Sequence, residues 1–252
     1  MSHSTSRYLA LGAMLIMLAL YGLTSAGWFG PNPVGSTSND VDPLIIPPPY
    51  AFAIWGPIYL GLIVFPIFQL FKRRDGHPAW IPLRQWFAAN VVANGVWLVF
   101  ASYDWQWLTV LVIVFMLFSL FRINQLLGRI AAAGAPYNYW VEWLVFSLYF
   151  AWVTLATVLN VSAALAFYDW QGFGLAAVNW TVIMIIIAAL IAGYTSYVFR
   201  DAAYAAVVVW AFVALATRHW EGIPTLGFLA AAVAVTFVGM GAWNFSRARR
   251  LA

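Results

Sequence analysis

Eight long apolar segments run through this 252-residue chain, and they constrain its fold more than any other feature. A helix needs roughly 17–25 apolar residues to cross the hydrocarbon core of a bilayer. Backbone groups in that core must find their hydrogen bonds within helices, and no strand-like alternation competes with this pattern. The segments cover residues 8–26, 50–71, 84–102, 107–127, 139–163, 174–192, 202–218 and 224–245. The pattern predicts an all-α protein, a polytopic transmembrane bundle of about eight helices.

The composition also indicates a membrane protein. Hydrophobic residues make up 64% of the chain and charged residues only 8%, too few for the surface of a soluble domain. The absence of cysteines excludes disulfides and thiolate metal sites. The net charge of +4 comes from basic residues between the apolar segments, where they mark membrane topology rather than nucleic-acid binding.

The basic residues fall almost entirely on one side of the predicted membrane. With the N-terminus inside, 11 of the 12 lysines and arginines lie on the inner side, and only Arg218 lies on the outer side. This bias predicts cytoplasmic N- and C-termini and a multi-pass protein of the cell inner (plasma) membrane. Arg7, the first apolar run and residues 24–26 also resemble a signal peptide, whose removal would leave seven spans. The length of the run and the topology favour a retained helix.

Several kinds of membrane chemistry lack the residues that they need. The only lysine, Lys72, lies at an inner helix end, which excludes a retinal Schiff base, and the histidines lie too near the ends for b-type haem. Glu142 is the only carboxylate within a span, and we expect it to snorkel or to pair with Arg129 rather than to relay protons. No nucleophile–base pair or metal-ligand cluster is visible. We therefore expect no enzyme, no metal site and no required cofactor.

The tetrapeptide YDWQ occurs twice, at 103–106 and 168–171, each time in a predicted outer turn. One interpretation is a duplicated helical hairpin. The other is independent capping, in which the Asp starts a helix and the Trp joins an interfacial belt. We favour the second interpretation.

Deep polar and aromatic residues form a single stripe on each of three predicted helices. At about 100° per residue, positions 3, 4, 7 or 11 apart lie on one helix face. The stripes are Trp55, Tyr59, Leu62 and Pro66 in the second segment, Asn90, Asn94 and Trp97 in the third, and Tyr149, Trp152, Ala156 and Asn160 in the fifth.

A rise of about 1.5 Å per residue places the deep amides and indoles of these stripes in the outer half of the membrane. They lie there beneath residues 27–49, a loop too rich in Pro, Gly and Ser to be helical throughout. An amide that faces lipid is costly, so the stripes should face each other or a ligand. They predict a pocket for a large, flat hydrophobic molecule, held by stacking and a few hydrogen bonds. The alternative is that the amides only tie helices together and the indoles only pack.

The stretch YFAWVTLATVLN at 149–160 resembles the last-helix signature of the TspO/MBR family, the tryptophan-rich sensory proteins that include the translocator protein. The matching residues are Tyr149, Trp152, Ala156, Thr157, Leu159 and Asn160. The family's third helix is similar at Asn94 and Trp97, and its second helix at Pro47, Pro48, Phe52, Trp55 and Tyr59. Departures are Asn90 in place of Gln, Leu148 in place of Pro, and a Phe52–Trp55 spacing that is one residue shorter.

The resemblance implies a TspO/MBR-like five-helix region at 1–165, followed by three additional transmembrane helices at 166–252. The family is known for binding porphyrins and other flat hydrophobic molecules, including sterols in animals. The resemblance implies a hydrophobic, tetrapyrrole- or porphyrin-like ligand, bound for sensing or transport. With the stripes, it predicts eight ligand-binding residues, of which Asn160 lies near the mouth or instead ties helices together. They are Trp55, Tyr59, Asn94, Trp97, Tyr149, Trp152, Ala156 and Asn160.

Two other functions stay open. The chain is a transporter of small hydrophobic solutes if the three extra helices form a second gating half. It is a structural or accessory membrane subunit if no ligand binds. The expected partners are the lipid bilayer and a hydrophobic small molecule, without nucleic acid. Small residues such as Gly239 and Ala242 permit close helix contacts, which makes a homodimer a further candidate.

Overall fold

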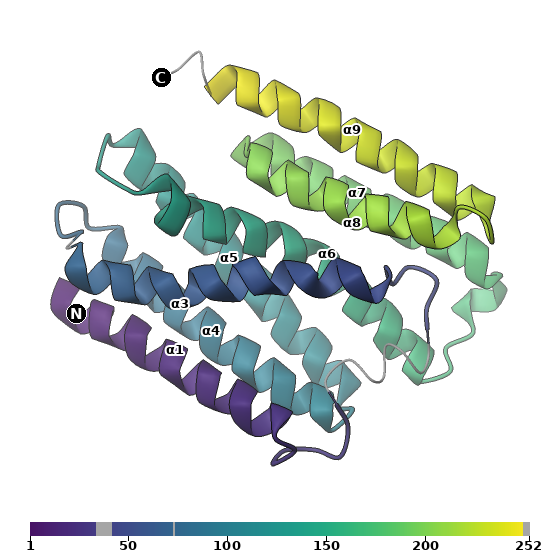
Figure 1. Ribbon diagram of the computed structural model, residues 1–252, viewed down its shortest axis with the longest axis horizontal. Coiled ribbons are helices and arrows are strands. Elements are labelled where there is room, and N and C mark those ends of the chain that lie inside the picture. Colours follow the sequence, from purple (N-terminus) through teal and green to yellow (C-terminus); the bar gives the residue numbers. More distant parts are fainter. Residues whose placement is uncertain (34–41, 73, 249–252) are drawn as a thin grey trace. The chain divides into compact units, whose positions relative to one another are not determined.

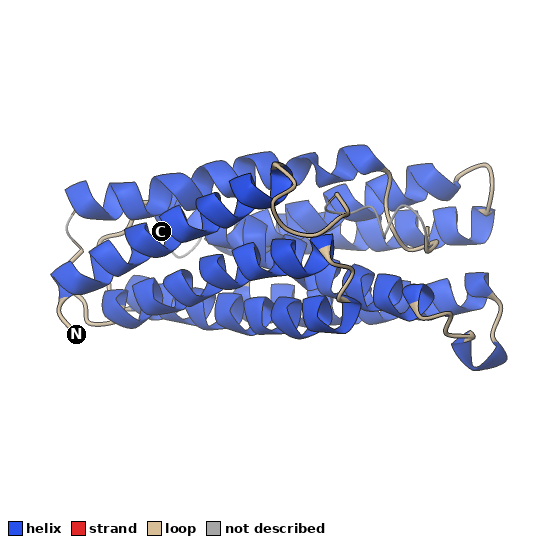
Figure 2. Ribbon diagram, turned by 90° about the horizontal axis from the view of Figure 1, so that it is seen from below, coloured by secondary structure: helices blue, strands red, loops and turns tan. Residues whose placement is uncertain are grey.

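Helices make up the regular structure of the protein. The computed structural model describes residues 1–33, 42–72 and 74–248, and within these ranges it contains helices and loops but no strand (Figure 1, Figure 2). The predicted all-α bundle of about eight helices is confirmed. The helices are α1 (His3–Ser25), α3 (Trp55–Phe71), α4 (Trp80–Ser102), α5 (Gln106–Ala132), α6 (Leu144–Phe167), α7 (Ala177–Phe199), α8 (Ala202–His219) and α9 (Pro224–Ala248). Short helical turns are η1 (Pro49–Ile54), η2 (Tyr139–Trp143) and η3 (Gly172–Gly174).

Seven helical segments in the described part of the chain are long and apolar enough to cross a membrane. The remaining helix, α4, has 23 residues, but it carries Arg84, Asn90 and Asn94, all of which are buried. These polar groups therefore lie inside the protein rather than against lipid, where each would be costly. The chain is a multi-pass membrane protein.

The chain divides into two compact units. Unit 1 consists of residues 1–40 and 56–150, and unit 2 consists of residues 41–55 and 151–252. The division falls within α6, between Phe150 and Ala151. The segment before α3 thus belongs with the C-terminal helices. The predicted division at residue 165, which rested on the family resemblance, stays a prediction.

In unit 1, α4 packs against both α1 and α5 (Figure 1). A Cβ atom at Gly95 would lie 2.8 Å from the Leu20 side chain and 3.4 Å from the Cα atom of Met17. The glycine therefore lets the two helices approach closely, as small residues do between membrane helices.

A buried polar cluster joins α3, α4 and η2 in unit 1. Gln69 accepts hydrogen bonds from Nε and NH2 of Arg84, at 2.9 and 2.6 Å, and donates one to Glu142. Arg74 donates to both carboxylate oxygens of Glu142, with its NH2 at 2.9 Å. The expectation that Glu142 snorkels or pairs with Arg129 is wrong. The carboxylate is fully buried in η2 and pairs with Arg74, which follows the end of α3.

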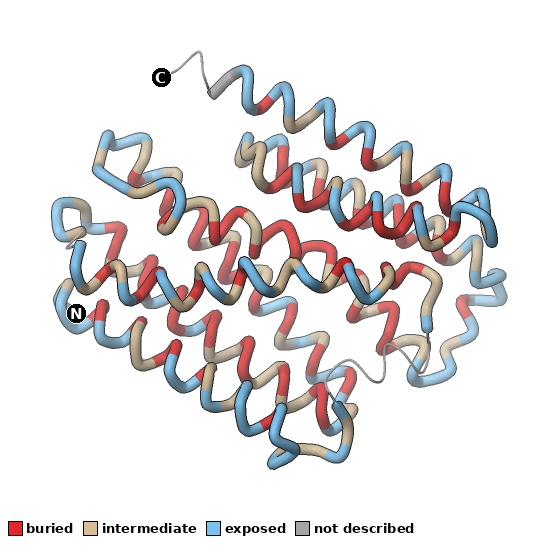
Figure 3. The backbone as a smooth tube through the Cα atoms, viewed as in Figure 1, coloured by how far each residue is buried: buried red, intermediate tan, exposed pale blue. Residues whose placement is uncertain are grey.

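In unit 2, α8 packs against α9, and α7 contacts both helices. The buried positions of α9 recur along one side, at Leu226, Ala230, Ala234 and Phe237 (Figure 3). The hydroxyl of Tyr204 on α8 hydrogen-bonds Thr154 on α6 at 3.0 Å, which ties these helices together inside the unit.

Both YDWQ sequences end a helix in the same way. Asp104 and Asp169 have φ values of 55° and 53° in the left-handed region. After α6, the N–H of Asp169 bonds the carbonyl of Ala166, and the N–H of Trp170 bonds that of Leu165. These two bonds form a Schellman motif, a helix C-cap. The expectation that the Asp starts a helix is wrong, because its left-handed backbone closes the preceding helix.

We expect a Gln69→Leu substitution to destabilise the protein by about 3 kcal/mol, because it leaves Arg84 and Glu142 each short of a buried partner. Unfolding by sodium dodecyl sulfate in mixed micelles measures the loss. Arg129→Met, a substitution at an exposed position, is the control. Equal midpoints for the two variants would show that the cluster does not stabilise unit 1.

Position 169 closes α6, and the stability of the protein should decrease in the order Gly, native Asp, Val when each of these residues occupies that position. Glycine adopts a left-handed backbone without penalty, whereas Val there should cost about 1–2 kcal/mol. Thermal unfolding of the three proteins measures the order. Position 169 is preferred to position 104, because the Asp104 side chain also accepts a hydrogen bond from Asn32. A Val variant as stable as the Gly variant would contradict the assigned cap.

Candidate functional site

The segment at residues 42–51, here called the strap, is held to the end of α8. Arg218 donates from NH1 to the carbonyls of Pro43, at 3.3 Å, and Ile46. Its NH2 lies 2.8 Å from a carboxylate oxygen of Asp42. One guanidinium therefore fixes three points of the strap.

Two further side chains of α8 also hold the strap. His219 Nε2 lies 2.6 Å from the carbonyl of Leu44, and Trp210 Nε1 donates to the carbonyl of Ala51 at 2.9 Å. The strap reads DPLIIPPPYA, and its prolines lack the N–H groups that regular structure requires. Its carbonyls therefore take donors from elsewhere, and α8 supplies them.

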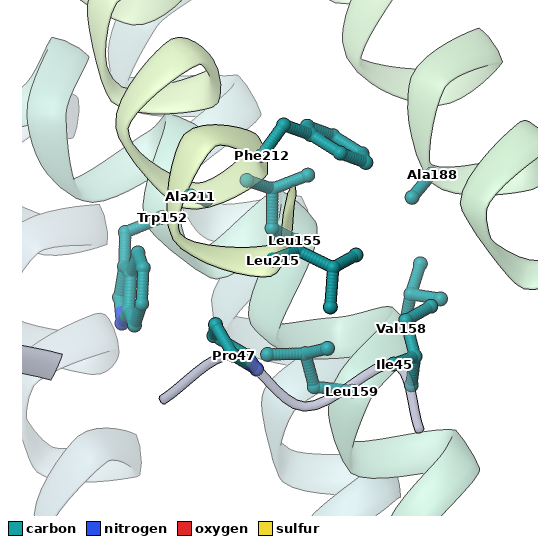
Figure 4. A pocket seen from close by; sticks show the side chains of 10 residues that line it. All are labelled: Ile45, Pro47, Trp152, Leu155, Val158, Leu159, Ala188, Ala211, Phe212 and Leu215. Carbon is teal, nitrogen blue, oxygen red and sulfur yellow. The ribbon is translucent and has the colours of Figure 1, made fainter. Parts of the chain in front are cut away.

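An apolar pocket of about 30 Å³ lies within unit 2, between the strap and helices α6, α7 and α8 (Figure 4). Nine of its ten lining side chains are purely hydrocarbon, and none is charged. The lining residues are Ile45 and Pro47 from the strap, Trp152, Leu155, Val158 and Leu159 from α6, Ala188 from α7, and Ala211, Phe212 and Leu215 from α8. We call this cavity the strap pocket.

Trp152 supplies the only polar side-chain group in that lining. Its side chain is 1% exposed, and its Nε1 has no hydrogen-bond partner among the described residues. The rings of Phe52 and Trp55 meet the indole edge to face, at centroid distances of 5.5 and 6.4 Å. A buried donor without a partner costs about 1–3 kcal/mol, so this N–H calls for an explanation.

Three predicted site residues form a hydrogen-bonded chain within unit 1. The Tyr59 hydroxyl donates to Oδ1 of Asn94 at 3.1 Å, and Nδ2 of Asn94 donates to the Tyr149 hydroxyl at 2.9 Å. Asn94 and Tyr149 are buried. The prediction that polar stripes of three helices face one another is confirmed for these residues.

Other predicted residues lie apart from that chain. Trp97 is half-buried in unit 1. In unit 2, Trp55 touches Trp152, and Ala156 and Asn160 follow on α6, with Asn160 8% exposed. As ligand contacts, all eight residues stay predictions.

Sequence reasoning missed the contribution of α7 and α8 to the pocket. Ala188, Ala211 and Leu215 are ordinary apolar residues of a span, and nothing distinguishes them from lipid-facing neighbours. A usable signal lay in Arg218, the only basic residue on the predicted outer side, where Asp42 of the long loop is also expected.

The fold and the pocket define a multi-pass helical membrane protein with a small apolar cavity beneath a tied strap. The family described as TSPO-like protein matches residues 7–243, a range that reaches into all eight helices. The chain belongs to the TSPO-like protein family, and the resemblance noted in the sequence is confirmed. Comparisons with curated proteins and with solved structures found no match. Membership is consistent with a role in membrane sensing or transport.

Replacing Arg218 with Met should loosen the strap. Losing three contacts of the guanidinium should speed amide hydrogen exchange at residues 44–46 by about tenfold or more. Hydrogen exchange with mass spectrometry measures this, and Arg129→Met is the matched control. Unchanged exchange in the strap of the Arg218 variant would mean that other contacts hold it.

Proposed function

We propose that this chain binds a hydrophobic small molecule inside the membrane, in a sensing or transport role. The strap pocket is its binding position in unit 2. The observation that carries the proposal is an apolar cavity lined in part by Trp152, whose buried Nε1 has no hydrogen-bond partner among the described residues. Small-molecule sites are usually lined mainly by apolar side chains with a few polar groups that fix orientation, and the strap pocket has a lining of this kind.

The proposed ligand class is flat and tetrapyrrole-like. Its support is the resemblance of residues 149–160 to the family signature, together with the aromatic rings of Phe52 and Trp55 around Trp152. A cavity of about 30 Å³ receives only one edge or substituent of a macrocycle. Binding of the whole molecule therefore requires the strap to lift, and its ties to Arg218 and His219 control that step.

The proposal also covers the membrane in which the protein lies and its lack of catalytic activity. The bias of basic residues supports a cell inner membrane protein with both termini in the cytoplasm. On that topology, the strap and Arg218 lie on the outer side. The chain then acts as a binding protein rather than an enzyme, and it requires no cofactor.

Transport of a hydrophobic solute is a second candidate function. It is favoured by the lining of the strap pocket, to which α7 and α8 contribute Ala188, Ala211, Phe212 and Leu215. These helices belong to the segment for which sequence analysis considered a second gating half. Protein-dependent flux of a labelled ligand across proteoliposomes would distinguish a carrier from a static receptor.

Filling the strap pocket should weaken ligand binding. Protoporphyrin should quench the tryptophan fluorescence of the purified protein saturably, and Ala188→Phe should raise the dissociation constant at least about tenfold, because the added ring displaces the ligand. Leu190→Phe is the control, since residue 190 is exposed on the same helix.

A double substitution tests the predicted aromatic contacts. Trp97→Ala with Trp152→Ala should reduce the affinity for protoporphyrin, since stacking on the indoles is lost. Protoporphyrin affinities that are equal in the native protein, the pocket-filling variant and this double variant would refute the proposed function.

A further inference from the structure

The turn that joins α6 to α7, at residues 168–176 and here called the aromatic turn, carries apolar side chains on its surface (Figure 1). Phe173 at its tip is 87% exposed, more than any other large hydrophobic residue in the described part of the chain. Tyr168 and Leu175 in the same turn are exposed as well. Apolar surface of this kind is unfavourable in water, so the surroundings of the turn need an explanation.

The backbone holds Phe173 at the tip in a strained conformation. Its φ of 54° and ψ of 28° lie in the left-handed region, which bulky side chains rarely adopt. Gly172 and Gly174 on either side also have positive φ values, 59° and 80°. The N–H groups of Gly174 and Leu175 bond the carbonyls of Gln171 and Gly172, at 2.9 and 3.0 Å. Strain of this kind persists only where the surroundings stabilise the residue.

The protein itself covers little of the Phe173 ring. The ring meets Trp170 edge to face at a centroid distance of 5.0 Å, and Trp170 meets Trp180 of α7 at 4.5 Å. Both indoles are half-buried, whereas most of the Phe173 side chain is uncovered. The indoles therefore form the base of the aromatic turn, and Phe173 forms its exposed tip.

The aromatic turn lies at a membrane surface, because both helices that it joins are long and apolar enough to cross a bilayer. With 24 and 23 residues, α6 and α7 are each about 35 Å long, slightly more than a hydrocarbon core of about 30 Å. Asp169, which caps α6, is the only charged residue between positions 161 and 199 of the sequence. The turn therefore carries almost no charge that would oppose its contact with lipid.

We infer that the aromatic turn is a lipid-binding wedge, whose tip Phe173 inserts among the acyl chains of the adjoining leaflet. The hydrocarbon ring of Phe173 gains from leaving water, and this gain offsets the strain of its backbone. Trp170 and Trp180 then lie at the headgroup level, where indoles combine an apolar body with a polar N–H. The wedge fixes the level of α6 and α7 in the bilayer, and it does not depend on the strap pocket.

Spin labels measure the depth of the tip directly. The chain has no cysteine, so Phe173→Cys and Gln171→Cys each place one nitroxide in the turn, and residue 171 is an exposed neighbour that serves as the control. The protein is placed in nanodiscs of phosphatidylcholine and phosphatidylglycerol, and collisions with oxygen and with a water-soluble nickel chelate give the depth of each label. The label at 173 should lie about 5–10 Å below the phosphates, and the label at 171 at or above them.

Two results of this experiment would overturn the inference. Equal access of the nickel chelate to both labels would place the tip in water. A label at 173 that is shielded from both reagents would show that protein covers the tip, either a partner or a second copy of the chain.

A second experiment keeps the label away from the tip. A nitroxide at Leu175→Cys should be shielded from the nickel chelate while Phe173 is native. Phe173→Asp should expose this label, because a charge among acyl chains is costly. Gln171→Asp adds the same charge beside the tip and should leave the label shielded. Equal depth of the label in all three proteins would mean that Phe173 does not hold the turn in the leaflet.

Discussion

A polar group in an apolar surrounding is costly unless it has a partner, and this constraint orders both units of the protein. In unit 1, Gln69 satisfies Arg84 and Glu142 at once, and Asn94 joins Tyr59 to Tyr149. These bonds specify how α3, α4 and α6 meet, which apolar contacts alone would leave less defined. The amides that make α4 the least membrane-like helix by composition are therefore the groups that fix its neighbours.

In unit 2, the same constraint acts on backbone rather than side chains. The proline-rich strap cannot satisfy its carbonyls by regular structure, and Arg218, His219 and Trp210 of α8 satisfy them. A strap held in this way is tied to α8 by hydrogen bonds from three side chains and by the ion pair of Arg218 with Asp42. Trp152 departs from the rule, as do the hydroxyls of Thr24 and Ser162, because its Nε1 has no hydrogen-bond partner among the described residues.

Much of the fold was predictable from the sequence, because bilayer thickness sets helix length. The eight apolar segments correspond to the eight helices, and helical phase brought Tyr59, Asn94 and Tyr149 to mutually facing sides. Contacts between segments far apart in the chain were not predictable. Spacing offered Arg129 as the partner of Glu142, whereas the tertiary partner is Arg74. The pocket-lining residues of α7 and α8 could not be predicted either, since an alanine beside a cavity and an alanine beside lipid look alike in sequence.

The central proposal is that the strap pocket is the binding position of a hydrophobic small molecule. The most direct measurement is a high-resolution structure of the protein extracted gently from its native membrane. We predict a bound, mainly apolar molecule under the strap, in contact with the side chains that line the strap pocket. A strap pocket closed by protein side chains, with no room for a guest, would contradict the account.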